Sequence, residues 1–246
     1  MSDLTGKRAL VTGASRGIGA AIALALAKAG ADVAITYSAS PDRAAEVVRG
    51  IEALGRRGTA IQADSADPAA IRRSVEEAVG ALGGLDILVN NAGIARGGPL
   101  ETMRLEDIDA IIDVNIRSVV LASQAAIPHL GQGGRIVNIG SCLAERVAMP
   151  GITVYSMSKS ALISLTKGLS RELGPRGITV NIVHPGPTDT DMNPADGPQA
   201  EGQRQLVSVG HYGQPEDIAA AVVFLAGPGG RQINGAGITV DGGLNA

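Results

Sequence analysis

The fold of this chain is decided by the stretch Thr12-Gly13-Ala14-Ser15-Arg16-Gly17-Ile18-Gly19, which joins a short apolar run to an alanine-rich one. Glycines at 13 and 17 permit a tight turn and a close approach of the backbone to a ligand, and a glycine at 19 lets a following helix pack tightly. The free N–H groups and positive dipole at the start of that helix favour a pyrophosphate. The stretch predicts a phosphate-binding strand–turn–helix unit, with an empty turn of the same shape as the alternative.

Apolar runs and helical patterns alternate along the rest of the chain. Short apolar runs predict seven strands, at residues 8–12, 31–37, 59–63, 85–90, 135–140, 178–184 and 237–241. Longer segments predict helices at residues 18–29, 41–54, 68–82, 105–130, 154–173 and 215–226. This alternation implies a parallel sheet with right-handed crossovers. We therefore expect an α/β fold: a single-domain, doubly wound Rossmann fold over residues 1–246, with a seven-stranded parallel sheet flanked by helices. The segment 187–210, rich in proline and glycine at its start, is interpreted as a lid.

Composition excludes several classes of function. Lysine and arginine number 21 against 24 aspartates and glutamates, a net charge of −3, and the chain has three tyrosines, one phenylalanine and no tryptophan. Such a chain lacks the charge and the stacking platforms that nucleic acids need. A single cysteine and three histidines predict no metal site and no internal disulfide. With no signal-like start and no apolar stretch of about 20 residues, we expect a cytoplasmic protein with neither membrane nor nucleic acid as a partner.

The end of the second predicted strand indicates which cofactor the phosphate turn would hold. That strand ends Ile35-Thr36-Tyr37-Ser38, without the acid that usually binds a ribose 2′-hydroxyl in NAD-binding folds. Without that carboxylate, Arg16 and Ser38 are free to hold a 2′-phosphate by charge and hydrogen bonding. We therefore expect NADP(H) to be preferred, with NAD(H) possible. The alternative is that Arg16 only points to solvent.

Tyr155 and Lys159 form the most suggestive catalytic pattern. They are four residues apart on a predicted helix and share one of its faces. A free phenol has a pKa of about 10, and an adjacent ammonium together with an oxidised nicotinamide would lower it. Ser141 follows the fifth predicted strand, at the edge where doubly wound sheets bind ligands. These residues predict an acid–base site, although Tyr155 and Lys159 alone could be an ordinary solvated pair.

With these residues in view, the chain resembles the short-chain dehydrogenase/reductase family over its whole length. The matching features are the turn at 12–19, Asp64, the run Asn90-Asn91-Ala92-Gly93, and Pro185-Gly186 followed by Thr190. Asn115, Ser141, Tyr155 and Lys159 match the family's catalytic tetrad. The resemblance implies that Tyr155 exchanges a proton with the substrate oxygen, and that Ser141 hydrogen-bonds this oxygen. It also implies that Lys159 holds the nicotinamide ribose and that Asn115 binds a water linking Lys159 to solvent.

The resemblance also implies a cofactor site and an assembly. The residues expected to bind the cofactor are Gly13, Ser15, Arg16, Gly17, Ile18, Gly19, Tyr37, Ser38, Asp64, Ser65, Asn91, Ala92, Gly93, Tyr155, Lys159, Pro185, Gly186, Thr188 and Thr190. Asp64 would meet the adenine, Asn91 and Gly93 would lie along the adenosine ribose, and Thr190 would sit near the nicotinamide or its phosphate. The expected assembly is a homotetramer or homodimer.

Function within the family stays open between two classes at this point. The first is reduction of a ketone or aldehyde, with 3-oxoacyl-(acyl carrier protein) reductases as near relatives; Arg171 and Arg176 could supply the basic patch that an acidic carrier protein needs. The second is nucleotide-binding regulation, because Asp64-Ser65-Ala66-Asp67 and the lid resemble the members that bind cyclic-di-GMP in biofilm dispersal. A small-molecule substrate with an uncharged body would contact Leu143, Glu145, Val147, Met149 and Met192, with packing as the alternative role of the methionines. Cys142 is interpreted as a buried, unreactive residue.

Overall fold

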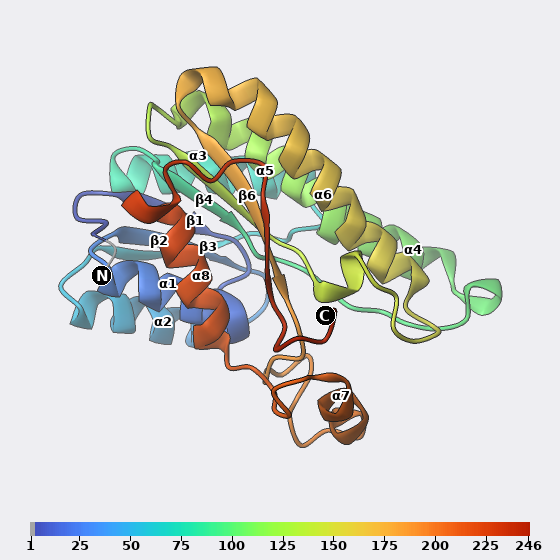
Figure 1. Ribbon diagram of the computed structural model, residues 1–246. Coiled ribbons are helices and arrows are strands. Elements are labelled where there is room, and N and C mark those ends of the chain that lie inside the picture. Colours follow the sequence, from blue (N-terminus) through green and yellow to red (C-terminus); the bar gives the residue numbers. More distant parts are fainter. Residues whose placement is uncertain (1–2) are drawn as a thin grey trace.

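The computed structural model of the protein describes residues 3–246 (Figure 1). Within them, seven strands form one parallel sheet: β1 (Arg8–Val11), β2 (Asp32–Tyr37), β3 (Gly58–Gln62), β4 (Ile87–Asn90), β5 (Arg135–Ile139), β6 (Thr179–Pro185) and β7 (Gly237–Val240). Their order across the sheet is β3-β2-β1-β4-β5-β6-β7, with every neighbouring pair parallel. The order reverses between β1 and β4, which is where ligands bind in doubly wound sheets. The predicted fold class is confirmed, and strand boundaries differ from prediction by one or two residues.

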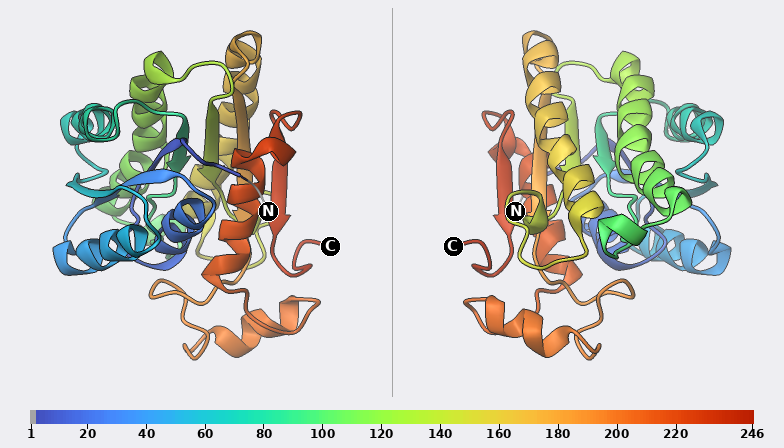
Figure 2. Two further views of the ribbon diagram at one scale, coloured as in Figure 1. Left: turned by 90° about the vertical axis from the view of Figure 1, so that its left-hand side faces the viewer. Right: turned by 90° about the vertical axis from the view of Figure 1, so that its right-hand side faces the viewer.

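Helices cover both faces of this sheet, as the side views in Figure 2 show. The first face carries α1 (Gly17–Lys28), α2 (Pro41–Ala53) and α8 (Pro215–Ala226), whose apolar residues share one core cluster with β1 and β2. The second face carries α3 (Pro68–Leu82), α4 (Leu105–Ile112), α5 (Ser118–Ala126) and α6 (Thr153–Leu173). Short 3₁₀ turns occupy Leu100–Thr102, Ile127–His129, Cys142–Ala144, Gly174–Arg176 and Pro228–Gly230. The strand-to-helix loops lie at the carboxyl ends of the strands, which is where ligands bind in sheets of this kind.

The predicted helix at 105–130 is not uniform. It consists of α4, a π-helical segment at Asp113–Arg117, α5 and a 3₁₀ turn. Such π segments often mark functional positions, and this one contains Asn115. The segment Leu105–His129 is also 25 residues long and contains an 18-residue window with a mean hydropathy of 1.4, which makes it long and apolar enough to cross a membrane by length and composition alone. Its packing against α3, α6 and the sheet accounts for that apolarity as a face of the core.

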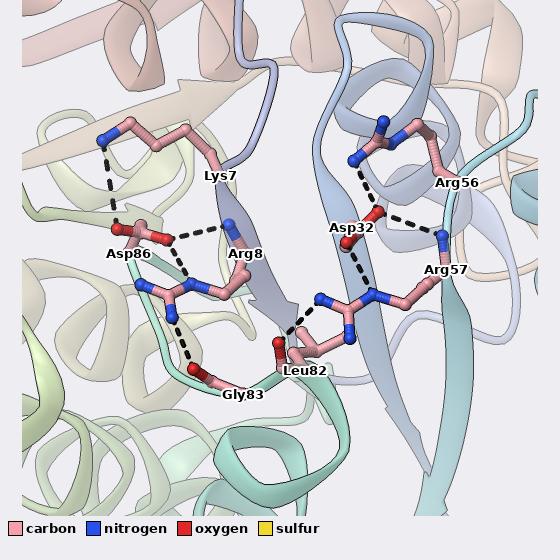
Figure 3. A network of polar contacts seen from close by, with 8 residues as sticks. All are labelled: Lys7, Arg8, Asp32, Arg56, Arg57, Leu82, Gly83 and Asp86. Atoms are coloured by element: carbon pink, nitrogen blue, oxygen red, sulfur yellow. Dashed lines mark hydrogen bonds and ion pairs between the residues drawn. The ribbon is translucent and has the colours of Figure 1, made fainter.

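Ion pairs join the amino ends of the strands, at the edge opposite the ligand site (Figure 3). Asp86, just before β4, accepts from Arg8 Nε at 2.7 Å, at the start of β1. Asp32, at the start of β2, accepts from Arg57 Nε at 2.8 Å and pairs with Arg56 Nη2 at 2.7 Å, just before β3. These contacts join β1 to β4 and β2 to β3 at the amino ends of the strands.

The lid, residues 187–210, extends beyond the sheet edge and contains the short helix α7 (Ala200–Leu206) (Figure 1). Sequence analysis predicted no helix here, because prolines and glycines interrupt the alternation of strands and helices in this segment. Two contacts order it: Asn193 Nδ2 donates to Gln203 Oε1 at 2.9 Å within the lid, and the Arg204 guanidinium lies 5.6 Å from the ring centre of Tyr212, just beyond it. The lid is thus a folded element with contacts of its own.

Candidate active site

A cavity of about 790 Å³ lies at the carboxyl ends of the strands, between the loops that follow β1, β4, β5 and β6. Every residue expected to bind the cofactor lines it: Gly13, Ser15, Arg16, Gly17, Ile18, Gly19, Tyr37, Ser38, Asp64, Ser65, Asn91, Ala92, Gly93, Tyr155, Lys159, Pro185, Gly186, Thr188 and Thr190. Ser141 lines the same cavity, whereas Asn115 lies behind its wall. Residues far apart in the chain are therefore brought to one site.

The phosphate turn is shaped by close contacts to the loop after β4. Gly13 has a φ of +63°, and a Cβ there would lie 2.8 Å from the Cα of Ala92. A Cβ on Gly19 would lie 2.4 Å from the side-chain nitrogen of Asn91. That nitrogen donates to the carbonyls of Thr12 at 2.9 Å and Gly13 at 3.0 Å, so the Asn91 amide fastens the two loops together. A side chain at Gly13 or Gly19 would therefore collide with the loop after β4, and α1 begins beside the turn with no side-chain cap and no acid in its first turn.

Arg16 does not simply point into solvent. Its Nη1 lies 3.3 Å from Oδ2 of Asp191 on the lid, and the same oxygen accepts from Nη1 of Arg43 at 2.5 Å. Arg43 stands in the first turn of α2, shortly after the end of β2. Sequence analysis missed Arg43 and Asp191, because nothing in their local spacing reveals that α2 and the lid meet here.

Ser141 is held by contacts to both its hydroxyl group and its backbone carbonyl. Its hydroxyl oxygen accepts from the backbone N–H of Leu143 at 3.1 Å, so the hydroxyl proton can be donated to another group, of which the Tyr155 phenol is one. Its carbonyl oxygen lies 3.0 Å from Nδ1 of His184, on β6. A carbonyl oxygen only accepts, so Nδ1 carries the proton, and burial lowers the pKa of His184, which keeps the ring neutral. The Nε2 atom of His184 is buried without a hydrogen-bond partner.

Tyr155 and Lys159 share one face of α6 and both line the cavity. Burial raises the pKa of the Tyr155 phenol, while a hydrogen bond from Ser141 acts in the opposite direction. Burial lowers the pKa of Lys159 to about 8. Lys159 is not among the groups that shift the Tyr155 pKa in this structure, where its Nζ donates at 3.0 Å to the carbonyl of Ile139, and the lowering expected with a bound nicotinamide stays a prediction. Ser141 is the neighbour that favours the phenolate here.

Asn115 is fully buried in the π-helical segment, and its side chain binds other parts of the chain. Its Oδ1 accepts from the backbone N–H of Ile94 at 2.9 Å, and its Nδ2 donates to the Ile94 carbonyl and to Ser158 Oγ, both at 3.0 Å. Ser158 in turn donates to the carbonyl of Tyr155 at 2.6 Å. Asn115 thus links the loop after β4 to the turn of α6 that carries Tyr155. The water expected at Asn115 stays a prediction.

The candidate substrate residues fall into two groups. Leu143, Met149 and Met192 line the cavity, as expected, but Glu145 and Val147 do not. Those two residues are exposed, because the chain turns outward after the 3₁₀ turn at Cys142–Ala144. Further lining residues that the sequence did not reveal come from several elements: Ile94, Arg96, Ile152, Gln199, Gln203, Leu206 and Leu244. Cys142 is buried and its pKa is raised to about 11, chiefly by desolvation, which agrees with a packing role.

Comparison with known proteins gives consistent matches over nearly the whole chain. A family model described as enoyl-(acyl carrier protein) reductase matches residues 13–245. The cyclic-di-GMP-binding biofilm dispersal mediator protein of Escherichia coli K12 is 43% identical over 246 residues, covering 100% of both chains. A 3-oxoacyl-(acyl carrier protein) reductase of Staphylococcus aureus Mu50 is 42% identical, with 97% of this chain and 98% of that protein covered.

A solved structure is more similar still. A short-chain dehydrogenase from Burkholderia cenocepacia J2315, crystallised in complex with NADP, has 65% sequence identity and a TM-score of 0.98, with 99% of each chain covered. At this identity and coverage, the two chains share one fold. The chain is a member of the short-chain dehydrogenase/reductase family of oxidoreductases.

Proposed function

We propose that the protein is an NADP(H)-dependent oxidoreductase that reversibly reduces the carbonyl of a small ketone or aldehyde to an alcohol. The observation that carries the proposal is that Ser141, Tyr155 and Lys159 line the same cavity as the phosphate turn. A hydroxyl donor, a phenol and an ammonium beside a dinucleotide site form the set that carbonyl reduction requires. Reversible reduction also needs a proton donor that can take its proton back, a role that suits Tyr155.

The residues present fit an NADP(H) molecule. The uncapped start of α1, without an acid in its first turn, suits the pyrophosphate. The end of β2 at Tyr37 and Ser38 carries no carboxylate to repel a 2′-phosphate, and the similar Burkholderia protein binds NADP. When bound, the reduced nicotinamide would supply the hydride that the carbonyl carbon receives.

The side chains then have distinct tasks. Ser141 would donate its hydroxyl proton to the substrate oxygen and stabilise the negative charge that develops there. Tyr155 would donate its phenolic proton to that oxygen during reduction and accept it during oxidation. Lys159 uses one of its N–H donors on the Ile139 carbonyl, and the remaining donors are available to a ribose hydroxyl. Asn115 would act as a positioning residue, through Ser158, for the start of α6.

Tyr155→Phe tests this assignment. The variant keeps the ring and removes only the proton donor, so we expect NADPH oxidation with an active ketone or aldehyde to fall by at least about 100-fold. The dissociation constant for NADPH, measured by fluorescence titration, should stay within about two-fold of that of the parent. Tyr212→Phe is the matched control, because Tyr212 lies outside the cavity lining. A Tyr155→Phe variant that turns over at the parental rate would show that the catalytic assignment is wrong.

The substrate class within this proposal is an uncharged carbonyl compound, including 3-oxoacyl thioesters. Apolar side chains from Ile94, Leu143, Met149 and Ile152 line the same cavity as Ser141 and Tyr155. Docking of an acyl carrier protein has weaker support, because the Arg176 guanidinium is bound to the carbonyls of Ile127 and Leu130. A screen of ketones, aldehydes and 3-oxoacyl thioesters, free and carrier-bound, would distinguish these substrates. We also propose that the protein is a cytoplasmic homotetramer or homodimer. Analytical ultracentrifugation would measure the mass of this assembly.

A second candidate is a nucleotide-binding regulator with weak or no catalysis. It is favoured by the full-length similarity to the cyclic-di-GMP-binding mediator of Escherichia coli. Titration calorimetry with cyclic-di-GMP, with and without NADPH, distinguishes the candidates. Heat of binding without carbonyl-dependent NADPH oxidation would favour the regulator.

A further inference from the structure

Asp191 of the lid lies between guanidinium groups from two other parts of the fold. Its Oδ2 binds Arg43 Nη1, on α2, at 2.5 Å and Arg16 Nη1, at the start of α1, at 3.3 Å. Among residues 3–246, neither arginine forms another ion pair. The two guanidiniums therefore form a site for one anion, and in this structure the anion is a carboxylate of the chain itself.

This anion site borders the cavity beside the phosphate turn and the loop after β2. Arg16, Ser38, Ser40 and Asp191 are among the residues that line the cavity. Arg43 follows shortly after the end of β2, where nucleotide-binding sheets recognise the ribose 2′ position. Any 2′-phosphate placed beside Ser38 would thus meet the same positive charge that Asp191 now neutralises.

We propose that Arg43 acts with Arg16 as the 2′-phosphate site, and that Asp191 is a built-in competitor that the phosphate must displace. This inference rests on the proposed use of NADP(H). A phosphate dianion carries more charge and more acceptor oxygens than a carboxylate, so it displaces Asp191 from the arginines. A cofactor without the 2′-phosphate leaves the contact between Asp191 and the arginines intact. Asp191 and Arg43 thereby set cofactor preference and connect it to the position of the lid.

Asp191→Asn tests the competition directly with 2′,5′-ADP, a probe that has the 2′-phosphate and no nicotinamide. All three side chains are more than half exposed, at 51%, 55% and 59%, so solvent weakens both ion pairs. Removing the competing charge should tighten 2′,5′-ADP binding by about three- to ten-fold. Binding of 5′-AMP, which lacks the 2′-phosphate, should change less than two-fold. Asp196→Asn is the matched control, because it removes one charge from the same lid at a residue without an arginine partner in the described chain.

Arg43→Gln completes a double-mutant cycle. Alone it should weaken 2′,5′-ADP binding several-fold, and in its background Asp191→Asn should have a smaller effect than in the parent. Hydrogen exchange gives an independent readout: 2′,5′-ADP should raise exchange in residues 187–196 of the parent, and 5′-AMP should not. In Asp191→Asn this exchange should be high before any ligand is added.

The outcomes separate this inference from the proposed function. Unchanged or weaker 2′,5′-ADP binding by Asp191→Asn, or an equal gain in Asp196→Asn, would overturn the competition, while carbonyl reduction would still be judged by Tyr155→Phe. A parent protein that binds 5′-AMP as tightly as 2′,5′-ADP would overturn both this inference and the proposed NADP(H) preference.

Discussion

Lys159 donates a hydrogen bond of 3.0 Å from its Nζ atom to the carbonyl of Ile139, the last residue of β5. The side chain is only 5% exposed, and no carboxylate pairs with it among the described residues. The contact joins α6 to the strand that leads directly to Ser141. It also places an ammonium where burial opposes its charge, which lowers the pKa of Lys159 to about 8.

This burial predicts how stability depends on pH. The unfolded chain, with a lysine pKa of about 10.4, binds more protons than the folded chain between pH 8 and 10.4, so folding becomes more favourable as pH rises through this range. In urea unfolding without added cofactor, the parent should gain about 2–3 kcal/mol relative to Lys159→Met between pH 7.5 and 10.5. Lys167→Met, an exposed position on the same helix, should show no such change. If the free energy of unfolding changed with pH by the same amount in the parent and in Lys159→Met, the predicted effect of Lys159 burial would be contradicted.

The fold was predictable because its signals are local and repeated. The glycine pattern from Gly13 to Gly19 and the alternation of strands with helices define the doubly wound class without any long-range information. The π-helical segment at Asp113–Arg117 and α7 were not predictable, because tertiary contacts decide them. Asn115 forms hydrogen bonds with Ile94 and Ser158, which belong to other elements. The pattern of apolar residues along a helix does not predict such long-range hydrogen bonds.

The site was predictable where residues directly follow strands, and less so elsewhere. Ser141 and Asn91 lie at strand ends, so the parallel sheet alone places them at one edge. Glu145 and Val147 were wrongly expected to contact the substrate, because the sequence does not reveal the direction of the chain after β5. The pairing of Asp191 with Arg43 joins positions 148 residues apart, and only the folded lid reveals it.

His184 positions Ser141 through the 3.0 Å hydrogen bond from Nδ1 to the Ser141 carbonyl. His184→Phe keeps the ring and removes this donor, so kcat for carbonyl reduction should fall by about three- to ten-fold, the equivalent of one hydrogen bond. The KM and the dissociation constant for NADPH should change little, because His184 does not line the cavity. His184→Asn, whose amide nitrogen can take the place of Nδ1, should recover much of the lost kcat. A variant that loses stability but keeps the parental kcat would show a purely structural role.

Asp32 predicts a loss of stability in acid. Burial raises the pKa of Asp32. Hydrogen bonds from Arg57 and the charges of Arg56 and Arg57 together lower it by more, so the net shift of the pKa is downward. A carboxyl with a lowered folded pKa stabilises the protein above its unfolded pKa of about 3.9 and loses this effect as pH falls through its folded pKa. Asp32→Asn should therefore lower the free energy of unfolding by about 2 kcal/mol at pH 7 and by much less near pH 3. Asp42→Asn, at an exposed position in α2, is the control. An equal loss at both pH values would exclude the ionic contribution.

Replacing a glycine by alanine should have opposite effects on stability at Gly13 and at Gly80. Its φ of +63° and the 2.8 Å approach of a Cβ to Ala92 mean that Gly13→Ala strains the backbone and separates the phosphate turn from the loop after β4. We expect a loss of at least about 1–2 kcal/mol in the free energy of unfolding, together with weaker NADPH binding. Gly80→Ala is the matched control, because Gly80 lies inside α3 with nothing within 4 Å of its added Cβ, and it should stabilise the chain by about 0.5–1 kcal/mol. Urea unfolding and fluorescence titration measure both variants. If Gly13→Ala bound NADPH as tightly as Gly80→Ala, the close contact between the turn and Ala92 would not be what shapes the phosphate site.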